Sequence, residues 1–170
     1  SLDVSNNTDL IGLLCNNNQL ISLDVSNNTA LQFLYAFNNN ITSLDVSNNI
    51  NLMQLYCQGN QIGSLDISVN INLHDLYCFN NNLTSLDLRN GNNINFGLFC
   101  ATNNPNLYCI SVDDVAWSDT NWTVANANID STMGFSTNCI AILGCTDPAA
   151  CNYDPLANTD DGSCLTTYGC

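Results

Sequence analysis

The chain has 170 residues, of which 45% are hydrophobic, so its composition excludes a disordered protein and allows one domain with a small appendage. Asp and Glu number 15 against a single cation, Arg89, and the formal net charge is −14. Because so few cations cannot neutralise phosphates, we expect no nucleic-acid partner and no anionic membrane surface as a partner. Ten cysteines favour an oxidising, extracellular setting.

A repeat of 21 residues occupies the first part of the chain. The heptapeptide LDVSNNT begins at Leu2 and again at Leu23, and each leucine of this period is followed by Asp. The leucines that mark the period are Leu2, Leu23, Leu44, Leu65 and Leu86. Each coil contains two similar halves, so we expect two short strands per coil that face each other across a thin apolar core. The sequence therefore predicts a β-rich solenoid of five coils over residues 1–104.

The halves follow the pattern LxxLxLxxNxL, for example from Leu31 to Ile41. This pattern resembles the leucine-rich-repeat consensus, and the doubled form resembles the nested class of Bacteroidetes surface proteins. The resemblance implies that coils stack as parallel strands about 4.8 Å apart. It also implies a location outside the cell or at its surface. The chain begins within a repeat and has no apolar run of membrane-spanning length, so we expect a piece of a longer protein.

Asparagine and cysteine recur at fixed positions of the coil. One asparagine column contains Asn18, Asn39, Asn60, Asn81 and Asn103, and another contains Asn7, Asn28, Asn49 and Asn70 and is broken at Gly91. An amide both donates and accepts, so we expect these side chains to satisfy backbone groups of the turns. The inward cysteine column contains Cys15, Cys57, Cys78 and Cys100. We interpret these thiols as small core residues; a metal site is the alternative, although one column gives a line and not a tetrahedron.

Alternation along the strands predicts two exposed faces. The LDVS strands direct an acid column outward, namely Asp3, Asp24, Asp45, Asp66 and Asp87. The other strands direct an aromatic row outward, namely Leu14, Tyr35, Tyr56, Tyr77 and Phe99, flanked by Phe33, Phe37 and Phe79. Stacking alone explains such a row, because cross-strand aromatic pairs stabilise a sheet. A sugar polymer or a protein also docks on such a row, because it offers area at low entropic cost.

The acid column requires compensation. Neighbouring carboxylates about 5 Å apart repel each other by roughly 1 kcal/mol in water. Hydrogen bonds from serine hydroxyls or backbone amides supply that compensation in one interpretation. Bridging calcium supplies it in the other.

Residues 105–143 lose the repeat and contain both tryptophans, Trp117 and Trp122. The last coil leaves an apolar end and open strand edges, so this segment is predicted to be a cap with both tryptophans in its core. It resembles segments that close this repeat class in related surface proteins, and that resemblance implies a disulfide between Cys109 and Cys139. The stretch from Asp130 to Thr132 resembles a Bacteroidetes O-glycosylation acceptor, which makes Ser131 a candidate modification site.

Residues 144–170 resemble a short secreted module with the pattern GCTDPxAxNYxPxAxxDDGSC. So short a unit cannot build a core, and its cysteines are candidate staples. Three pairings are open; we favour Cys145 with Cys164 and leave the partners of Cys151 and Cys170 open. Calcium is a candidate cofactor, with oxygen ligands from Asp147, Asp154, Asn158, Asp160 and Asp161. Ordinary Asx turns are the alternative role of these side chains.

No constellation indicates catalysis. His74 has no nucleophile beside it in any motif, and the repeat makes the acids nearly equivalent, whereas hydrolysis needs unequal ones. The sequence favours a non-enzymatic extracellular adhesion or interaction protein that binds a protein or polysaccharide at a bacterial surface. The alternative is a self-associating protomer of an extracellular fibre, and a hydrolase is a distant third.

Overall fold

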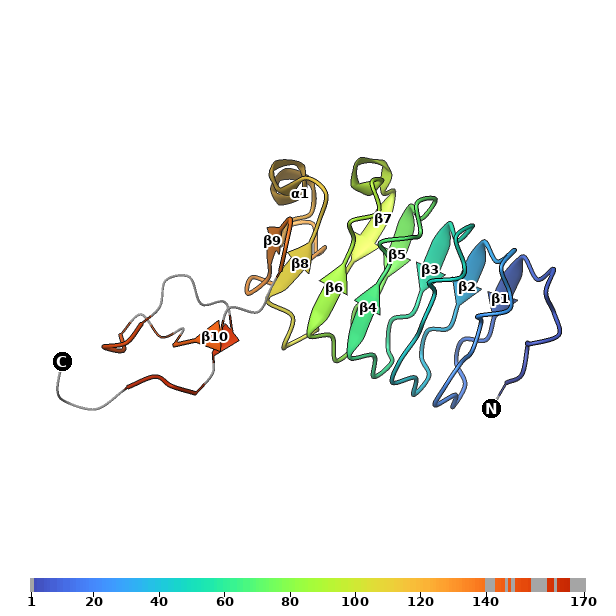
Figure 1. Ribbon diagram of the computed structural model, residues 1–170, viewed down its shortest axis with the longest axis horizontal. Helices are drawn as coiled ribbons and strands as arrows, with labels where there is room; N and C mark the ends of the chain where they lie inside the picture. Colours follow the sequence, from blue (N-terminus) through green and yellow to red (C-terminus); the bar gives the residue numbers. More distant parts are fainter. Residues whose placement is uncertain are drawn as a thin grey trace. The chain divides into compact units, whose positions relative to one another are not determined.

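A computed structural model describes residues 2–139, 143–145, 147, 149–153, 159–160 and 162–165. The chain forms two compact units, Ser1–Thr137 and Asn138–Cys170, and each is described by itself. In the first unit, the strands follow one another as successive rungs of a solenoid, as the colours from blue to orange show in Figure 1. The fold class expected from the repeat, a leucine-rich-repeat solenoid, is confirmed.

One parallel sheet contains a strand from each coil, in the order β1-β2-β3-β5-β7. Its strands are β1 (Gly12–Leu14), β2 (Phe33–Tyr35), β3 (Gln54–Tyr56), β5 (Asp75–Tyr77) and β7 (Leu98–Cys100). Equivalent residues pair directly, so that Leu13 lies beside Leu34 and Leu34 beside Leu55. One coil therefore advances the sheet by one strand, and equal positions of the repeat form straight columns.

A second parallel sheet has the order β4-β6-β8-β9. Its strands are β4 (Ser64–Asp66), β6 (Ser85–Asp87), β8 (Cys109–Ser111) and β9 (Gly134–Ser136). The first two come from the LDVS segments of coils four and five, and the last two come from the cap. In coils one to three the corresponding segments lie outside the assigned strands, so the expected second strand is present only in coils four and five. The cap thus extends this sheet by two strands, because its backbone groups pair with the open edge of β6.

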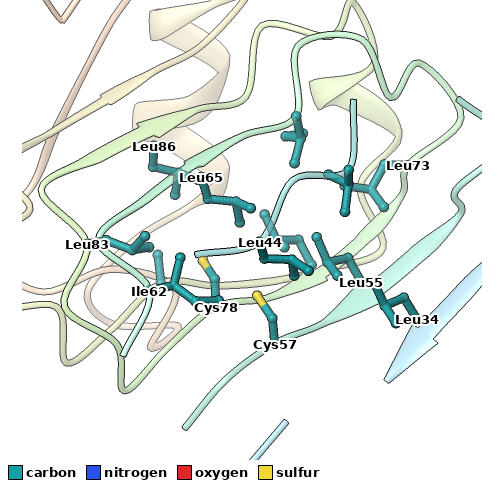
Figure 2. Close-up of a cluster of buried hydrophobic side chains, with 14 of the residues drawn as sticks. Leu34, Leu44, Leu55, Cys57, Ile62, Leu65, Leu73, Cys78, Leu83 and Leu86 are labelled. Atoms are coloured by element: carbon teal, nitrogen blue, oxygen red, sulfur yellow. The ribbon is translucent and has the colours of Figure 1, made fainter. Parts of the chain in front are cut away.

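The apolar side chains of both sheets share one core. Leucines of neighbouring coils, such as Leu34, Leu55 and Leu76, are fully buried. Figure 2 shows leucines from the two sheets directed toward each other, with Cys57 and Cys78 among them. No coil encloses these side chains alone, since each leucine is covered by the coils on either side.

Asparagines satisfy the backbone between coils, as the sequence predicts. The Asn60 amide donates to the carbonyls of Ala36 and Cys57 at 3.0 Å, and its oxygen accepts from the Ile41 amide at 3.0 Å. In the second column, Asn49 donates to the carbonyls of Val25 and Asn28. Asn60 therefore bonds both within its own turn and to the coil before it, whereas the Asn49 side chain bonds only to the coil before it, and the Asn49 amide oxygen accepts no hydrogen bond from the described residues.

Coil five is two residues longer than the coils before it. Tyr77 pairs with Cys100, which lies 23 positions later, whereas Tyr56 and Tyr77 are 21 positions apart. The extra residues lie between Leu88 and Asn93, where the short 3₁₀-helix η1 (Asn93–Asn95) begins. At the break of the second asparagine column, Asn90 makes the bond to the preceding coil by donating to the Asn70 carbonyl, while Asn93, which is 1% exposed, donates to the Leu88 carbonyl.

This insertion corrects three sequence assignments. Asn104, and not Asn103, continues the first asparagine column, because its amide donates to the Cys78 carbonyl and accepts from Leu83. Ala101, and not Cys100, occupies the inward cysteine position and is fully buried. Cys100 lies instead in the outward row beside Tyr77.

The third correction concerns Phe99, which was expected in the outward aromatic row. Phe99 pairs with Leu76 and is only 5% exposed. Its ring lies 4.4 Å from the ring of Trp122, measured between centroids. Phe99 therefore belongs to the core, because the longer coil shifts it from the outward position to the inward one.

Aromatic rings close the end of the solenoid. Trp122 is 4% exposed and contacts Phe96, Phe99, Trp117 and Phe135. The cap helix α1 (Val115–Asn121) presents Trp117 and begins at Asp114, whose carboxylate accepts from the Trp117 amide. Trp122 therefore lies in the core of the cap, as predicted, whereas Trp117 is half-buried and packs against that core.

We expect Phe99→Ala to lower the free energy of unfolding by about 3–5 kcal/mol, because it opens a cavity beside Trp122. The half-buried Phe33 is the matched control, and Phe33→Ala should cost about half as much or less. Chemical denaturation followed by tryptophan fluorescence measures both. An equal, small cost for the two variants would place Phe99 in the outward row and refute the register described above.

Candidate partner-binding surface

Three tyrosines form a stacked ladder on the outer side of the first sheet. The ring centroids of Tyr35 and Tyr56 are 4.6 Å apart with planes 8° apart, and those of Tyr56 and Tyr77 are 5.0 Å and 28° apart. Their positions in β2, β3 and β5 are paired in register. Because the spacing of parallel strands, about 4.8 Å, lies within the range of centroid distances that aromatic pairs prefer, the sheet itself sets the ladder geometry.

Phenylalanines flank the ladder on both sides. Phe33 precedes Tyr35 in β2, while Phe37 and Phe79 lie two positions after a ladder tyrosine. The Phe79 ring meets the Tyr77 ring edge to face, with centroids 5.9 Å apart. All six rings are half-buried. The six residues Phe33, Tyr35, Phe37, Tyr56, Tyr77 and Phe79 are called the aromatic face below.

A chain of hydrogen bonds runs beside the ladder. The Tyr35 hydroxyl donates to Gln54 Oε1, and Gln54 Nε2 donates to Asp75 Oδ2 at 2.8 Å. Asp75 Oδ1 accepts from the Leu98 amide at 3.0 Å and lies 3.3 Å from His74 Nδ1. Sequence reasoning missed this chain, although the 21-residue spacing of Gln54 and Asp75 places them on neighbouring strands. The hydrogen bond to Gln54 therefore ties the Tyr35 hydroxyl to the neighbouring strand.

The ladder presents ring edges and hydroxyl groups. Each ring of the pair Tyr35 and Tyr56 covers a face of the other, so those two faces are not available to a partner. Burial among its neighbours raises the pKa of Tyr56, and the Asp75 carboxylate raises it further. The hydroxyl of Tyr56 therefore stays protonated at neutral pH and can donate a hydrogen bond.

On the opposite side, the acid column is stabilised locally. The carboxylates of Asp3, Asp24 and Asp45 each accept a hydrogen bond of 2.9 Å from the backbone amide two residues later. Hydrogen bonds from the serine side chain and then the serine amide lower the pKa of all three carboxyl groups. At Asp24 the neighbouring Asp3 opposes this effect. The hydrogen bonds expected from the first interpretation are therefore present, and bridging calcium stays a prediction.

Asp87 is held by the one cation of the chain. Arg89 Nε donates to Asp87 Oδ1 at 2.9 Å, and the Arg89 amide donates to the same oxygen at 3.0 Å. The hydrogen bonds of the Arg89 side chain lower the pKa of Asp87. Arg89 Nη1 also donates to the Thr137 carbonyl, so the guanidinium group makes its hydrogen bonds to groups of the same chain.

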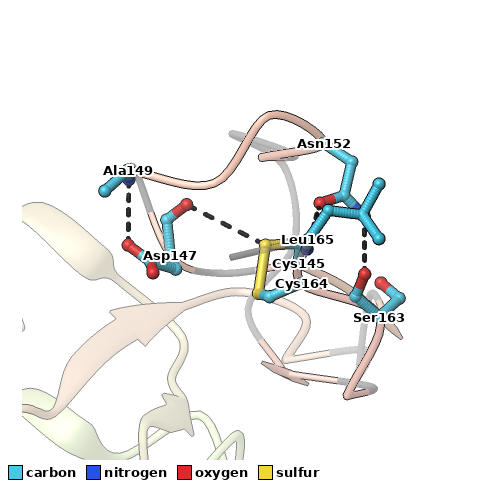
Figure 3. Close-up of a disulfide and its surroundings, with 7 residues drawn as sticks. All are labelled: Cys145, Asp147, Ala149, Asn152, Ser163, Cys164 and Leu165. Carbon is cyan, nitrogen blue, oxygen red and sulfur yellow. Dashed lines mark hydrogen bonds between the residues drawn. A yellow bond between two sulfur atoms is a disulfide. The ribbon is translucent and has the colours of Figure 1, made fainter. Parts of the chain in front are cut away.

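The second unit contains the expected Cys145–Cys164 disulfide, shown in Figure 3. Its short strands β10 (Leu143–Gly144) and β11 (Thr159–Asp160) pair in parallel. Asn152 connects the two halves, donating to the Ser163 carbonyl and accepting from the Leu165 amide at 2.8 Å. Cys109, Cys139 and Cys151 are also disulfide-bonded. The pairing of Cys109 with Cys139 stays a prediction.

The expected calcium ligands are only partly described. The Asp147 carboxylate accepts from the Ala149 amide at 2.9 Å in an Asx turn, visible in Figure 3. Asp154, Asn158 and Asp161 lie outside the described residues, and for Asp160 only the backbone is described. Among the residues that the structure describes, no cluster of three His, Cys, Asp or Glu side chains could hold a metal ion. Calcium binding by this unit therefore stays a prediction.

The inward thiols are core residues. Burial raises the pKa of Cys15, raises that of Cys57 to about 12, and raises that of Cys78 well above its ordinary value. Protonated thiols of this kind suit the apolar core, as the sequence predicts. Ser131 is exposed in a turn of the cap, which makes it accessible, and its glycosylation stays a prediction.

Comparisons with known proteins give fold-level likenesses. No family model matches the chain. The chain is similar to the functional domain of InlJ from Listeria monocytogenes, which includes a cysteine ladder, with 26% identity and a TM-score of 0.36 over 66% of this chain and 36% of that one. It is also similar to an internalin (inlF) from Listeria monocytogenes, with 23% identity and a TM-score of 0.42 over 62% of this chain and 43% of that one.

A short segment is similar to curated plant proteins. Over 25 residues, or 15% of this chain, it is 68% identical to the chloroplastic ribulose bisphosphate carboxylase/oxygenase activase of Oryza sativa subsp. japonica. Over the same length it is 64% identical to the chloroplastic activase 1 of Larrea tridentata. The chain spans 5% of each of these relatives and less than half of each matched structure. Within the described residues, no helix is long and apolar enough to cross a membrane.

The lowered pKa values predict acid sensitivity. The carboxyl groups of Asp3, Asp24 and Asp45 have pKa values below the ordinary 3.8 in the folded protein, so the unfolded chain binds protons more readily. Their contribution to stability is present above about pH 4 and is lost as pH falls through the lowered values. Thermal melting followed by circular dichroism should therefore show a falling melting temperature below about pH 4.

The triple variant Asp3→Asn, Asp24→Asn and Asp45→Asn is the matched control. Each amide oxygen can still accept the turn hydrogen bond, but it does not titrate. We expect a shallower fall in melting temperature for this variant over the same pH range. An identical fall in both proteins would show that other groups cause the acid sensitivity.

Proposed function

We propose that the chain is a non-enzymatic interaction module of an extracellular surface protein, and that its aromatic face binds a protein partner. The observation that carries the proposal is the Tyr35–Tyr56–Tyr77 ladder with its flanking phenylalanines, which gathers six half-buried rings on one side of one sheet. Contiguous aromatic surface of this kind is typical of protein interaction sites. The solenoid acts as a rigid support for it.

The side chains of the aromatic face are already ordered by their neighbours, which supports this proposal. Binding costs free energy when mobile side chains become fixed, and tyrosine loses little because it has only two rotatable bonds. Here the rings are already held by stacking and by the hydrogen bond from Tyr35 to Gln54. A partner therefore meets a surface that needs little further ordering.

Ring orientation favours a protein over a polysaccharide. A sugar ring packs its C–H groups flat on an exposed aromatic face, where the ring carries negative charge density. In the ladder, Tyr56 is stacked between Tyr35 and Tyr77, so only the two end rings keep a free face, and the ladder otherwise presents edges and hydroxyl groups. These edges suit the mixed apolar and polar contacts of a protein interface.

Two further features support a non-enzymatic extracellular role. The Cys145–Cys164 disulfide is of a kind that persists in oxidising compartments. Asp3, Asp24 and Asp45 all make the same local turn, so their environments are alike, and acid–base hydrolysis needs two carboxyl groups with separate pKa values.

Selection of peptides from a random phage-displayed library on the immobilised chain tests the proposal. We expect enriched peptides whose affinity falls at least about tenfold for the variant Tyr35→Ser, Tyr56→Ser and Tyr77→Ser, because it removes the centre of the face. Tyr108→Ser is the control, since Tyr108 is 49% exposed and lies outside the ladder. A glycan array probed in parallel tests the polysaccharide alternative.

Circular dichroism must first show that the triple variant is folded. If it is folded and the peptides bind it as well as they bind the original chain, the aromatic face is not the binding surface. If glycans bind and no peptide is enriched, the partner is a polysaccharide and the protein assignment is wrong.

Self-association into a fibre is the second candidate function, and an exposed apolar row favours it. Ile50, Ile71 and Ile94 occupy equivalent turns of successive coils and are 54%, 61% and 63% exposed, with Val69 nearby at 46%. Such a row on a protein surface is a candidate interface between copies.

Negative-stain microscopy tests this second function. If the isoleucine row mediates assembly, the chain forms filaments, and the variant Ile50→Lys, Ile71→Lys and Ile94→Lys does not, because charges oppose burial of the row. A uniform field of monomers from the original chain over a wide concentration range would exclude the fibre.

A further inference from the structure

The tyrosine ladder ends in a gap. Tyr77 pairs with Cys100, so the fourth outward position along the row carries a short side chain in place of a ring. The row continues past this gap, because the Ala101 amide donates to the Asn128 carbonyl as the Cys57 amide donates to that of Tyr77. Asn128 in the cap therefore takes the next position of the row. Cys100 lies between two larger neighbours.

A hollow occupies this place. It has a volume of about 460 Å³ and is lined by Tyr77, Phe79, Gly97, Leu98, Phe99, Cys100, Asn126, Ala127 and Asn128. Tyr77 and Phe79 form one wall, and the cap loop of residues 126–128 forms the other. Two steps of a parallel sheet separate those walls, or about 9.6 Å. One ring placed midway lies about 4.8 Å from each wall, which is the spacing within the ladder.

We propose that this hollow is a slot for an aromatic side chain of the protein partner, which stacks on Tyr77 as the fourth ring of the ladder. The inference rests on the proposed function and deepens it. Tyr77 provides the ring face, Phe79 an aromatic edge, and Leu98 an apolar side that is 43% exposed. The arrangement selects a flat apolar group one ring thick.

The side chains of Cys100 and Asn128, which line the slot, are held by the protein itself. The Cys100 thiol donates to the Ala127 carbonyl at 3.2 Å, and the Asn128 amide donates to the Phe99 carbonyl at 2.8 Å. Asn128 Oδ1 accepts from the Thr123 amide at 3.1 Å. These contacts fix the walls before a ligand arrives. They also engage the polar atoms of Cys100 and Asn128, which are therefore less available to the hydroxyl groups of a sugar, and this favours an aromatic ring as the occupant.

No charged side chain lines the slot. Stacking and apolar burial are therefore the interactions that select the ligand, and an aromatic side chain gains from both. A branched aliphatic side chain is apolar but too thick to stack flat on Tyr77. This difference in shape makes leucine a suitable comparison for tryptophan.

Nuclear magnetic resonance titration of the ¹⁵N-labelled chain tests the slot with defined probes. N-acetyl-L-tryptophanamide is compared with N-acetyl-L-leucinamide and with methyl β-D-glucopyranoside. We expect the tryptophan amide to bind about tenfold more tightly than the other two, and to shift the amide signals of Leu98, Cys100 and Ala127. Equal affinity for all three probes, preference for the sugar, or shifts confined to other residues would each overturn the proposal.

One variant fills the slot, another removes its stacking face, and a third is the control. Cys100→Tyr places the fourth ring within the chain and should abolish binding of the tryptophan amide without lowering the melting temperature. Cys100→Ser is the size-matched control and should retain binding. Tyr77→Leu removes the stacking face and should also abolish binding, which gives a second reading if Cys100→Tyr is unfolded. Unchanged affinity in either folded variant refutes the slot.

Failure of the slot and failure of the proposed function are distinguishable. Selected peptides that lose affinity for the triple tyrosine variant and bind Cys100→Tyr normally would show that the aromatic face binds protein but the slot takes no part. Peptides that bind the triple tyrosine variant normally would instead refute the aromatic face as a whole.

Discussion

Parallel pairing between equivalent residues of successive coils determines where every side chain of the solenoid lies. Leu13, Leu34 and Leu55 pair in sequence, so a residue type that repeats every 21 positions becomes a straight column. The same constraint makes each column depend on its neighbours, because no coil buries its own leucines. Stability and surface chemistry thus arise from one geometric rule, and a change in coil length alters both.

The repeat buries backbone groups between coils and stacks carboxylates in a column, and both arrangements cost free energy. Hydrogen bonds within a coil or to its neighbour offset that cost. Asn60 joins two coils through three hydrogen bonds in the core, where an unpaired backbone group is costly. Asp24 and Asp45 accept hydrogen bonds from the amides two residues later, which offsets the repulsion between stacked carboxylates. The asparagine and aspartate hydrogen bonds each involve only one coil or two neighbouring coils. The same contacts can therefore recur in every coil of the solenoid.

The aromatic face also results from the in-register pairing of successive coils. Unlike the acid column, it presents aromatic rings on the surface. Strand spacing places Tyr35 and Tyr56 in contact, which stabilises the sheet and also presents a preordered surface. Stability and binding are therefore not alternative explanations of the ladder. The cap adds something that the coils lack, since its loop of residues 126–128 closes one end of the row beside Cys100 and creates a hollow there.

The sequence by itself determined the solenoid, its period and the columns through coil four, because a strict repeat leaves one way to stack. It also indicated the cap and the Cys145–Cys164 disulfide. Tertiary structure decided coil five. The stretch Leu98-Phe99-Cys100 alternates equally well in either register, and local pattern cannot show that two extra residues before Asn93 shift it. Phe99 turns inward because Trp122, far along the chain, provides an aromatic core that only the folded cap brings beside it. For the same reason, contacts between coils, such as that of Gln54 with Asp75, emerged only from the fold.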